Sequence, residues 1–408
     1  MYLEIFYSKK IIFFFTFIFP ISLISGPAIP DILATIFGLV AVFILIKTKE
    51  TEIIKSKYII FFLIFWLYLI LSSILSENIF FSLKTSVPYL RLILFSIFIY
   101  LMSKNIYFIN SLFLGFTASY IILICDTSII LIETNFQMND MSKPIQITNM
   151  FDGERIVGSF LSRTLPLYFG LFLLLKNKYK YKYIIWLITF LSIFIIFLSG
   201  ERSAIFYSIL FIILLFFLFK KLRFLIFLLI IFLSLTFVVT GSYKNIKNRF
   251  IDYTVYQIFN NKDKINIFSI GHEELYKTSY ETFKENYIFG SGPNTFRLKC
   301  EDYNLENSCS TSAHNIYIQS LSETGIIGFL FLSLVFLILS FFILREFIMR
   351  NFLNLTIIND AALLFIICSF INIWPIIPTG NLFHNWINII YFMPLGLIIY
   401  SLNSKLES

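Results

Sequence analysis

Long apolar runs recur along the whole chain and alternate with short polar segments. Each run holds roughly 17 to 25 mostly apolar residues, the length that an α-helix needs to cross about 30 Å of hydrocarbon. The pattern predicts an all-α polytopic membrane protein with about twelve transmembrane helices. We place these spans approximately at residues 11–25, 32–46, 58–75, 88–102, 106–132, 156–175, 183–199, 203–219, 222–240, 322–344, 355–373 and 382–402.

One large loop separates the ninth and tenth predicted spans and sets the organisation of the chain. Residues 1–240 carry nine spans, residues 241–321 form the loop with short helices, and residues 322–408 carry three spans, all in a single integrated domain. The composition excludes a soluble globular domain, because 58% of residues are hydrophobic, only 14% are charged, and the mean hydropathy is +0.84. Lysines precede the first span, but no small-residue cleavage site follows before Pro30, so we expect a retained helix.

The distribution of lysine and arginine predicts the orientation, because short loops rich in these residues stay in the cytoplasm. With both termini cytoplasmic, the short cytoplasmic segments hold more than half of the 32 basic residues. The net charge of +8 therefore reflects membrane topology, and scattered basic residues do not suggest nucleic-acid binding. The cytoplasmic residues are Lys9, Lys10, Lys47, Lys49, Lys55, Lys57, Lys104, Lys176, Lys178, Lys180, Lys182, Lys220, Lys221, Arg223, Arg345, Arg350 and Lys405.

The same topology places every histidine of the chain on the outer side of the membrane. Imidazoles exchange protons near neutral pH, so these residues are candidates for acid or base work. Several arginines share the side, and the chain has no GxxxxGK phosphate loop. Because nucleotide sugars are cytoplasmic, an activated lipid-linked donor fits this side best. The outer histidines and arginines are His272, His314, His384, Arg155, Arg163, Arg202, Arg249 and Arg297.

Two arginines near the membrane edge are candidates for binding a diphosphate. Arg202 lies in the short turn between the seventh and eighth spans, and Arg163 lies in the sixth span, just inside the predicted membrane edge. A guanidinium group binds phosphate oxygens through two parallel hydrogen bonds. The alternatives are that Arg202 pairs with Glu201 and that both arginines extend toward phospholipid headgroups.

The large loop carries a further set of motifs. Residues 271–283, which include His272, predict an amphipathic helix, and the glycines of 290–292 predict a tight turn before Arg297. His314 precedes an expected short interfacial helix and two glycines that open the tenth span. Packing explains the helix and the glycines equally well, and a lone histidine is often only a structural hydrogen-bonding group.

Two of the four cysteines lie nine residues apart in this loop. Cys300 and Cys309 form a disulfide candidate, because an oxidising outer compartment permits the bond. Two unpaired thiols are the alternative. We expect no metal site, because no CxxC spacing occurs and His314 is the only histidine close to them in the sequence.

Three segments together resemble the O-antigen ligase and polymerase superfamily of bacterial envelopes. They are the Ser-Gly-Glu-Arg-Ser turn at 199–203, the Gly-Ser-Gly-Pro-Asn-Thr-Phe-Arg segment at 290–297, and the histidine segment at 313–328. The likeness covers roughly residues 150 to 345 and the overall topology, and the histidine segment is its most specific part. The resemblance implies a GT-C-like fold with a periplasmic loop, in a bacterial inner-membrane protein.

The resemblance also implies an activity and residue roles. It implies a glycosyltransferase, independent of metal and without a cofactor, that moves a glycan from undecaprenyl diphosphate to an acceptor hydroxyl with inversion. His314 would deprotonate or orient that hydroxyl, and Arg202 would hold the diphosphate. Relatives often carry a second arginine near the position of His272, so His272, Arg297 or Arg249 would take its place here, with Arg163 as a further candidate.

Ligase and polymerase share a donor and differ in the acceptor, which is lipid A core or a second lipid-linked glycan. We favour the ligase. The main alternative of another class is a transporter or flippase for lipid-linked sugars. Transporters usually show internal repeats and ionisable residues near mid-membrane, whereas this chain shows no obvious repeat and concentrates such residues on one side.

Overall fold

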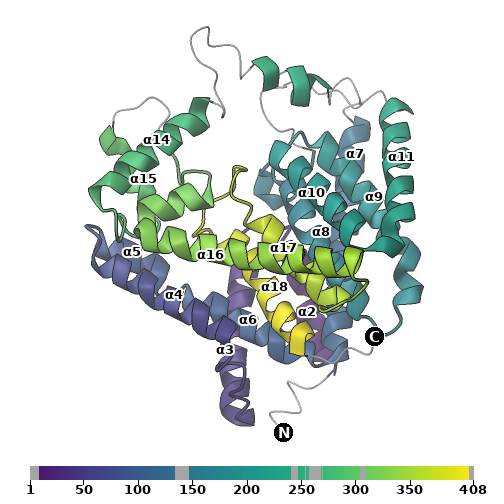
Figure 1. The fold of residues 1–408 in the computed structure, drawn as a ribbon, viewed down its shortest axis with the longest axis horizontal. Coiled ribbons are helices and arrows are strands. Elements are labelled where there is room, and N and C mark those ends of the chain that lie inside the picture. Colours follow the sequence, from purple (N-terminus) through teal and green to yellow (C-terminus); the bar gives the residue numbers. More distant parts are fainter. Residues whose placement is uncertain are drawn as a thin grey trace.

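The computed structural model describes residues 9–133, 147–239, 247–252, 254–256, 268, 270–303 and 309–403. Throughout these residues the regular secondary structure is helical, and the helices pack side by side (Figure 1). The main ones are α2 (Lys9–Ser22), α3 (Ala28–Thr48), α4 (Lys57–Ile74), α5 (Ile79–Ser86), α6 (Leu90–Ser103), α7 (Ile106–Glu133), α8 (Val157–Leu174), α9 (Lys182–Leu198), α10 (Arg202–Leu218), α11 (Arg223–Val239), α14 (Ile270–Glu285), α15 (Phe296–Lys299), α16 (Ile316–Phe352), α17 (Asp360–Asn372) and α18 (Asn385–Asn403).

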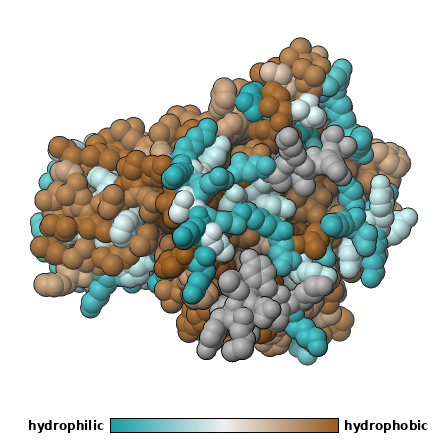
Figure 2. Space-filling view, turned by 90° about the horizontal axis from the view of Figure 1, so that it is seen from below, coloured by the Kyte–Doolittle hydropathy of each residue, from teal (hydrophilic) through white to brown (hydrophobic). Residues whose placement is uncertain are grey.

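Each predicted span overlaps an apolar helix. Among the described residues, nine helical stretches are long and apolar enough to cross a membrane, and α2, α10 and α17 are shorter apolar helices. Hydrocarbon offers backbone amides no hydrogen-bond partner, so a spanning segment must form its own hydrogen bonds as a helix. The protein is therefore a polytopic helical membrane protein. Large apolar side chains are exposed along many of these helices, and Figure 2 shows hydrophobic side chains over much of one face.

Close helix packing depends on small residues inside the bundle. Helix α2 packs on α7, and α18 packs on α6. A Cβ atom at Gly115 would collide with the carbonyl oxygen of Phe17, and one at Gly396 with that of Ser96. Glycine thus lets the backbones approach closely, as is common between membrane helices.

The largest difference from the sequence expectation concerns the tenth span. We expected residues 322–344, whereas α16 extends from Ile316 to Phe352, and Gly325 interrupts it with φ 64° and ψ −168°. The expected interfacial helix is thus the first part of α16, before this kink. The apolar-run criterion missed it because its residues are largely polar, although Ser320, Ser322 and Glu323 are all buried.

Loops that the charge pattern assigns to one side of the membrane contact one another. On the predicted cytoplasmic side, Lys104 forms an ion pair of 2.5 Å with Glu50, and Lys220 donates to Asn354. On the opposite side, the Phe151 amide donates to the Ile24 carbonyl over 2.8 Å. Each of these contacts joins segments that the charge pattern assigns to the same side.

A buried ion-pair network closes the predicted cytoplasmic end of α16 and α17. The Arg350 guanidinium donates to Glu346, which is fully buried, over 2.9 Å and to Asp360 over 2.6 Å. It also donates to the Ile358 carbonyl over 2.7 Å, and the Ile358 amide donates to Glu346 over 3.0 Å. Every guanidinium nitrogen thus has a partner, which a buried charge requires.

We expect Arg350→Ala to destabilise the protein by about 3–5 kcal/mol, because it leaves the Glu346 carboxylate buried without its cation. The thermal unfolding midpoint of the purified protein in detergent measures this effect. The control is Lys221→Ala, which removes an exposed basic side chain at the same end and should leave the midpoint almost unchanged. Equal midpoints for the two variants would show that the network does not stabilise the fold.

Candidate functional site

Two histidines that are 42 positions apart in the sequence meet on the predicted outer side. The His272 and His314 rings are nearly parallel, with centroids 5.8 Å apart and planes 18° apart. His272 lies in the first turn of α14, and His314 precedes α16; these two helices pack against each other. Their packing therefore brings two titratable groups into one site.

The backbone around His314 is fixed by the loop between α17 and α18. His314 has a φ of 53°, a left-handed conformation that is uncommon for a residue with a side chain. Its carbonyl accepts a hydrogen bond of 2.7 Å from the Thr379 amide, and the Thr379 hydroxyl accepts one of 2.9 Å from the Ile316 amide. The ring Nε2 lies 3.2 Å from the Ser310 hydroxyl. This bonding holds the imidazole in one orientation.

Both imidazoles favour the neutral form at neutral pH. Burial lowers the pKa of His314 below its usual value of about 6.5. Burial also lowers the pKa of His272, and the neighbouring His314 lowers it further. A neutral imidazole can accept a proton, so this pair can supply a base.

A disulfide lies beside the histidine pair. Cys300 and Cys309 are bonded to each other. Cys300 is buried in a small cluster with Leu275 of α14 and with Ala313, the neighbour of His314. The disulfide thus links the segment before His314 to the end of α15 and, through the contact with Leu275, to α14.

The Glu323 carboxylate connects several segments on the predicted outer side. It is fully buried and accepts hydrogen bonds from the amides of Asn294 and Phe296, over 3.0 and 2.8 Å, and from the Gln319 side chain over 2.9 Å. The Gln319 side chain also donates to Asn381 over 2.8 Å. One carboxylate therefore connects α16, the glycine turn and the loop before α18.

The glycine turn packs against the kink in α16. With α16 interrupted at Gly325, the carbonyls of Ser322 and Glu323 accept hydrogen bonds from the amides of Ser291 and Gly292, over 2.9 and 2.8 Å. A Cβ atom at Gly325 would collide with the Ile288 carbonyl. The two glycine-rich motifs of the sequence are thus two halves of one structural contact.

Arg297 is held at the edge of this network. Its Nη2 donates to the Asn294 side chain over 3.0 Å and to the Thr311 carbonyl over 3.4 Å, three residues before His314. Asn381 donates to the same two oxygens, over 3.3 and 3.2 Å. His384 has Arg297 among its charged neighbours. The structure therefore brings Arg297 and the histidines to one region.

Arg202 follows a carboxylate with a structural role. Glu201 is buried and accepts hydrogen bonds from the first amides of α8, those of Gly158 and Ser159, over 2.6 and 2.8 Å. Burial raises the pKa of Glu201 to about 7, and these amides oppose the rise. A carboxylate at a helix N-terminus is favourable, so Glu201 anchors the turn that carries Arg202.

Arg163 lies inside the helix bundle and is only 2% exposed. Its guanidinium donates to the carbonyl and side-chain oxygens of Asn372, over 3.2 and 3.1 Å, and to the Ser159 hydroxyl over 3.1 Å. It also lies over the Tyr207 ring, 4.7 Å from the centroid. These neutral partners occupy the side chain, so its contacts are those of a packing residue that joins α8, α10 and α17.

One predicted site residue, Arg249, cannot be placed by its side chain. Arg249 lies in the short segment Asn248–Asp252, and its side chain falls outside the described part. Among the residues that the structure describes, no three histidine, cysteine, aspartate or glutamate side chains lie close enough together to hold a metal ion. The sequence analysis gave no role to Gln319 and Glu323, although both lie in the histidine segment at 313–328, and it did not single out Asn381. The sequence did offer one signal for Glu323, which is an acidic residue at the start of an apolar run. Burying a charged side chain there is costly, so such a residue is expected to have a partner or a role.

The fold and the site define a polytopic membrane protein with a histidine and arginine site where its helices meet a large loop. Residues 187–333 match a family model described as O-antigen ligase, and this segment includes Arg202, His272, Arg297 and His314. The match confirms the resemblance to the O-antigen ligase and polymerase superfamily, and it supports a lipid-linked glycan transferase in general. No curated protein matches the chain.

We expect Glu323→Ala to lower stability by about 1–3 kcal/mol for each backbone amide left unsatisfied, those of Asn294 and Phe296. Glu323→Gln keeps one acceptor oxygen and should fall between this variant and the native protein. The measurement is the thermal unfolding midpoint, and Glu281→Ala, at an exposed site on α14, is the control. A midpoint for Glu323→Ala equal to that of the control would contradict the network.

Proposed function

We propose that the protein is a periplasmic-face glycosyltransferase that moves a glycan from undecaprenyl diphosphate to an acceptor hydroxyl. We favour an O-antigen ligase, with lipid A core as the acceptor; the alternative is a polymerase that uses a second lipid-linked glycan. The observation that carries the proposal is the half-buried His272–His314 pair, inside the segment that matches the family model.

The proposed reaction is a single displacement. The acceptor hydroxyl attacks the anomeric carbon of the donor sugar, the bond from that carbon to the diphosphate oxygen breaks, and the configuration inverts. The His314 imidazole takes the hydroxyl proton as the new bond forms. The diphosphate leaves with the bonding electrons, and guanidinium groups stabilise its growing negative charge.

We divide the proposed roles among the basic residues by their charge. Arg202 and Arg297 keep their charge at any working pH, so both suit the diphosphate. His272 adds a second imidazole beside His314, in a position where protonation of one ring opposes protonation of the other. We assign Arg202 and Arg297 to the diphosphate, with His272 as an additional ligand beside the base.

The acceptor separates the two favoured activities. In a strain that lacks the protein, a ligase predicts loss of all long-chain polysaccharide on lipid A core and accumulation of polymerised lipid-linked glycan. Core that carries a single repeat unit would instead identify a polymerase. Purified protein with a lipid-linked donor and each acceptor in turn gives the same distinction in vitro.

We expect His314→Ala to lower the rate of glycan transfer by about 10²–10⁴-fold, the range of a general base. Purified protein, a lipid-linked glycan donor and a core acceptor supply the assay, and chelator should leave the native rate intact. The control is Lys277→Ala, which changes an exposed side chain of α14. A native rate of transfer by His314→Ala would show that His314 is not the base of the reaction.

The pH dependence of transfer follows from the state of His314. Its neutral form is the base and its pKa lies below the usual histidine value, so kcat/KM should fall only as the pH drops below about 6.5. A profile of kcat/KM against pH measures this acid limb. A limb centred above that value would mean that a different group, or a histidine with a raised pKa, limits the reaction.

A further inference from the structure

The Cys300–Cys309 disulfide joins the two chain segments that carry Arg297 and His314. Cys300 follows Arg297 by three residues at the end of α15, and Cys309 precedes His314 by five. The disulfide therefore connects a residue assigned to the diphosphate with the residue assigned as the base. The proposed reaction gives this bond no role.

Residues 309–312 form an arm between the disulfide and the base. In this arm the Ser310 hydroxyl lies 3.2 Å from His314 Nε2. The carbonyl of the next residue, Thr311, accepts a hydrogen bond of 3.4 Å from Arg297 Nη2. The position of the arm therefore sets how the imidazole and the guanidinium lie relative to each other.

Among the described residues, the hydrogen bonds that hold this arm are long. Those from Arg297, Asn381 and the His314 amide measure 3.2 to 3.4 Å, at or beyond the usual upper end of about 3.2 Å. Cys309 and Thr311 are also exposed at the surface. The covalent bond is therefore the strongest attachment of the arm.

The α15 end of the disulfide is held in place by other contacts. The Phe296 amide donates to Glu323 over 2.8 Å. Lys299 forms ion pairs of 2.7 Å with Glu77 and of 3.1 Å with Glu285. Breaking the disulfide would thus leave α15 where it is.

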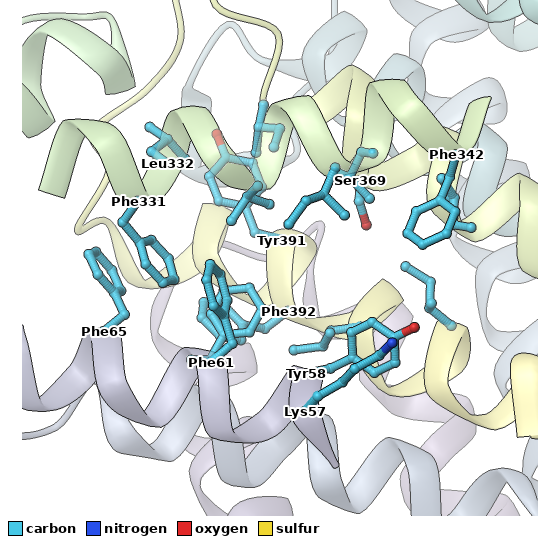
Figure 3. A pocket seen from close by; sticks show the side chains of 18 of the residues that line it. Lys57, Tyr58, Phe61, Phe65, Phe331, Leu332, Phe342, Ser369, Tyr391 and Phe392 are labelled. Carbon is cyan, nitrogen blue, oxygen red and sulfur yellow. The ribbon is translucent and has the colours of Figure 1, made fainter. Parts of the chain in front are cut away.

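The chain after His314 is also anchored without the disulfide. Thr379 is hydrogen-bonded to the His314 carbonyl and to the Ile316 amide, over 2.7 and 2.9 Å. Ile316 is fully buried and lines an apolar cavity of about 410 Å³ between α4, α16, α17 and α18 (Figure 3). Breaking the disulfide would therefore release the arm and leave the helices on both sides of it in place.

We propose that the Cys300–Cys309 disulfide is a positioning element for glycan transfer, and that its reduction by a dithiol switches the site off. The inference rests on the proposed function for the nature of the reaction. Once the arm is released, Ser310 no longer orients the His314 ring and Thr311 no longer holds Arg297. The base and the guanidinium then lose their common alignment, while the fold persists.

The reduction is an ordinary thiol–disulfide exchange. A thiolate of the dithiol attacks the sulfur of Cys309, which is exposed, and Cys300 leaves as a thiolate that takes up a proton. The second thiol then displaces Cys309 and closes a disulfide within the reductant. Two electrons and two protons pass to the protein. Cys300 is only 1% exposed, so its thiolate leaves slowly, and a dithiol drives the exchange to completion where a monothiol does not.

The test compares Cys309→Ser, which lacks the bond, with native protein reduced by dithiothreitol. Cys309 is exposed, so serine fits there, and Cys300 keeps its buried packing. The control is Cys125→Ser, which changes an exposed free cysteine of α7 in the same way. Thiol counts verify the reduction, which should raise the free thiols from two, Cys125 and Cys368, to four.

We expect kcat/KM for transfer to fall by about 10–10²-fold in Cys309→Ser and in reduced native protein, because a displacement of ~1 Å at a reacting group costs up to about 10²-fold. Reoxidation should restore the native protein, dithiothreitol should change Cys309→Ser no further, and Cys125→Ser should match the native protein. A native rate in Cys309→Ser, or in native protein with four free thiols, would overturn the proposal. If Cys309→Ser does not fold, reduction and reoxidation of the native protein decide alone.

The pH response separates positioning from a general loss of structure. Once the arm is released, the His314 ring is less buried, so its pKa should rise toward about 6.5, and the acid limb of kcat/KM should move up with it. The other groups around this ring, His272 on α14, Arg297 on α15 and the neutral Thr379, lie on segments that stay in place. NMR of histidine-labelled protein measures the titration directly. A lower rate with an unchanged His314 titration would show that the disulfide does not position the base.

The NMR titration is independent of the transfer reaction. If native protein transfers no glycan but reduction reversibly shifts the titration of His314, the proposed function fails and the positioning role stands. If native protein transfers glycan equally well with and without the disulfide, the positioning role fails and the proposed function stands.

Discussion

The predicted outer half of the protein depends on the buried carboxylate of Glu323. A carboxylate removed from water is costly unless its oxygens are fully hydrogen-bonded. Glu323 meets this requirement with two backbone amides from the glycine turn and with the Gln319 side chain. Through Gln319 and Asn381 the same network reaches the loop before α18. The segments that carry Arg297 and His314 are therefore held by one centre, and neither is a free loop.

The same principle orders the charged residues elsewhere in the bundle. Arg350 is balanced by Glu346 and Asp360 at the predicted cytoplasmic end. Glu201 is held by the N-terminus of α8. These groups, and Arg163 as well, form hydrogen bonds or ion pairs that hold helices of the bundle together. The histidine pair differs, because its rings contact each other and bring two proton acceptors together. That difference is what makes the pair the centre of the site.

Apolar runs predicted the helices well, because hydrocarbon leaves the backbone no other way to satisfy its amides. They failed at the start of α16, where a buried polar turn precedes the kink at Gly325 and does not look like a membrane segment. The sequence could nominate His272 and His314 singly, from residue type and predicted side. Their contact depends on how α14 packs against α16, which local pattern does not encode. The hydrogen bonds of Arg163 could not be predicted from the sequence either, because its partner Asn372 lies on a distant helix.

The central claim is that lipid-linked diphosphate chemistry takes place at the outer site built around His314. A structure of the protein with undecaprenyl diphosphate bound tests this claim most directly. We expect the two phosphates within hydrogen-bonding distance of Arg202 or Arg297, on the side that His314 faces. Phosphates bound at the Lys57 end of the helices, with no phosphate near His314, would contradict it.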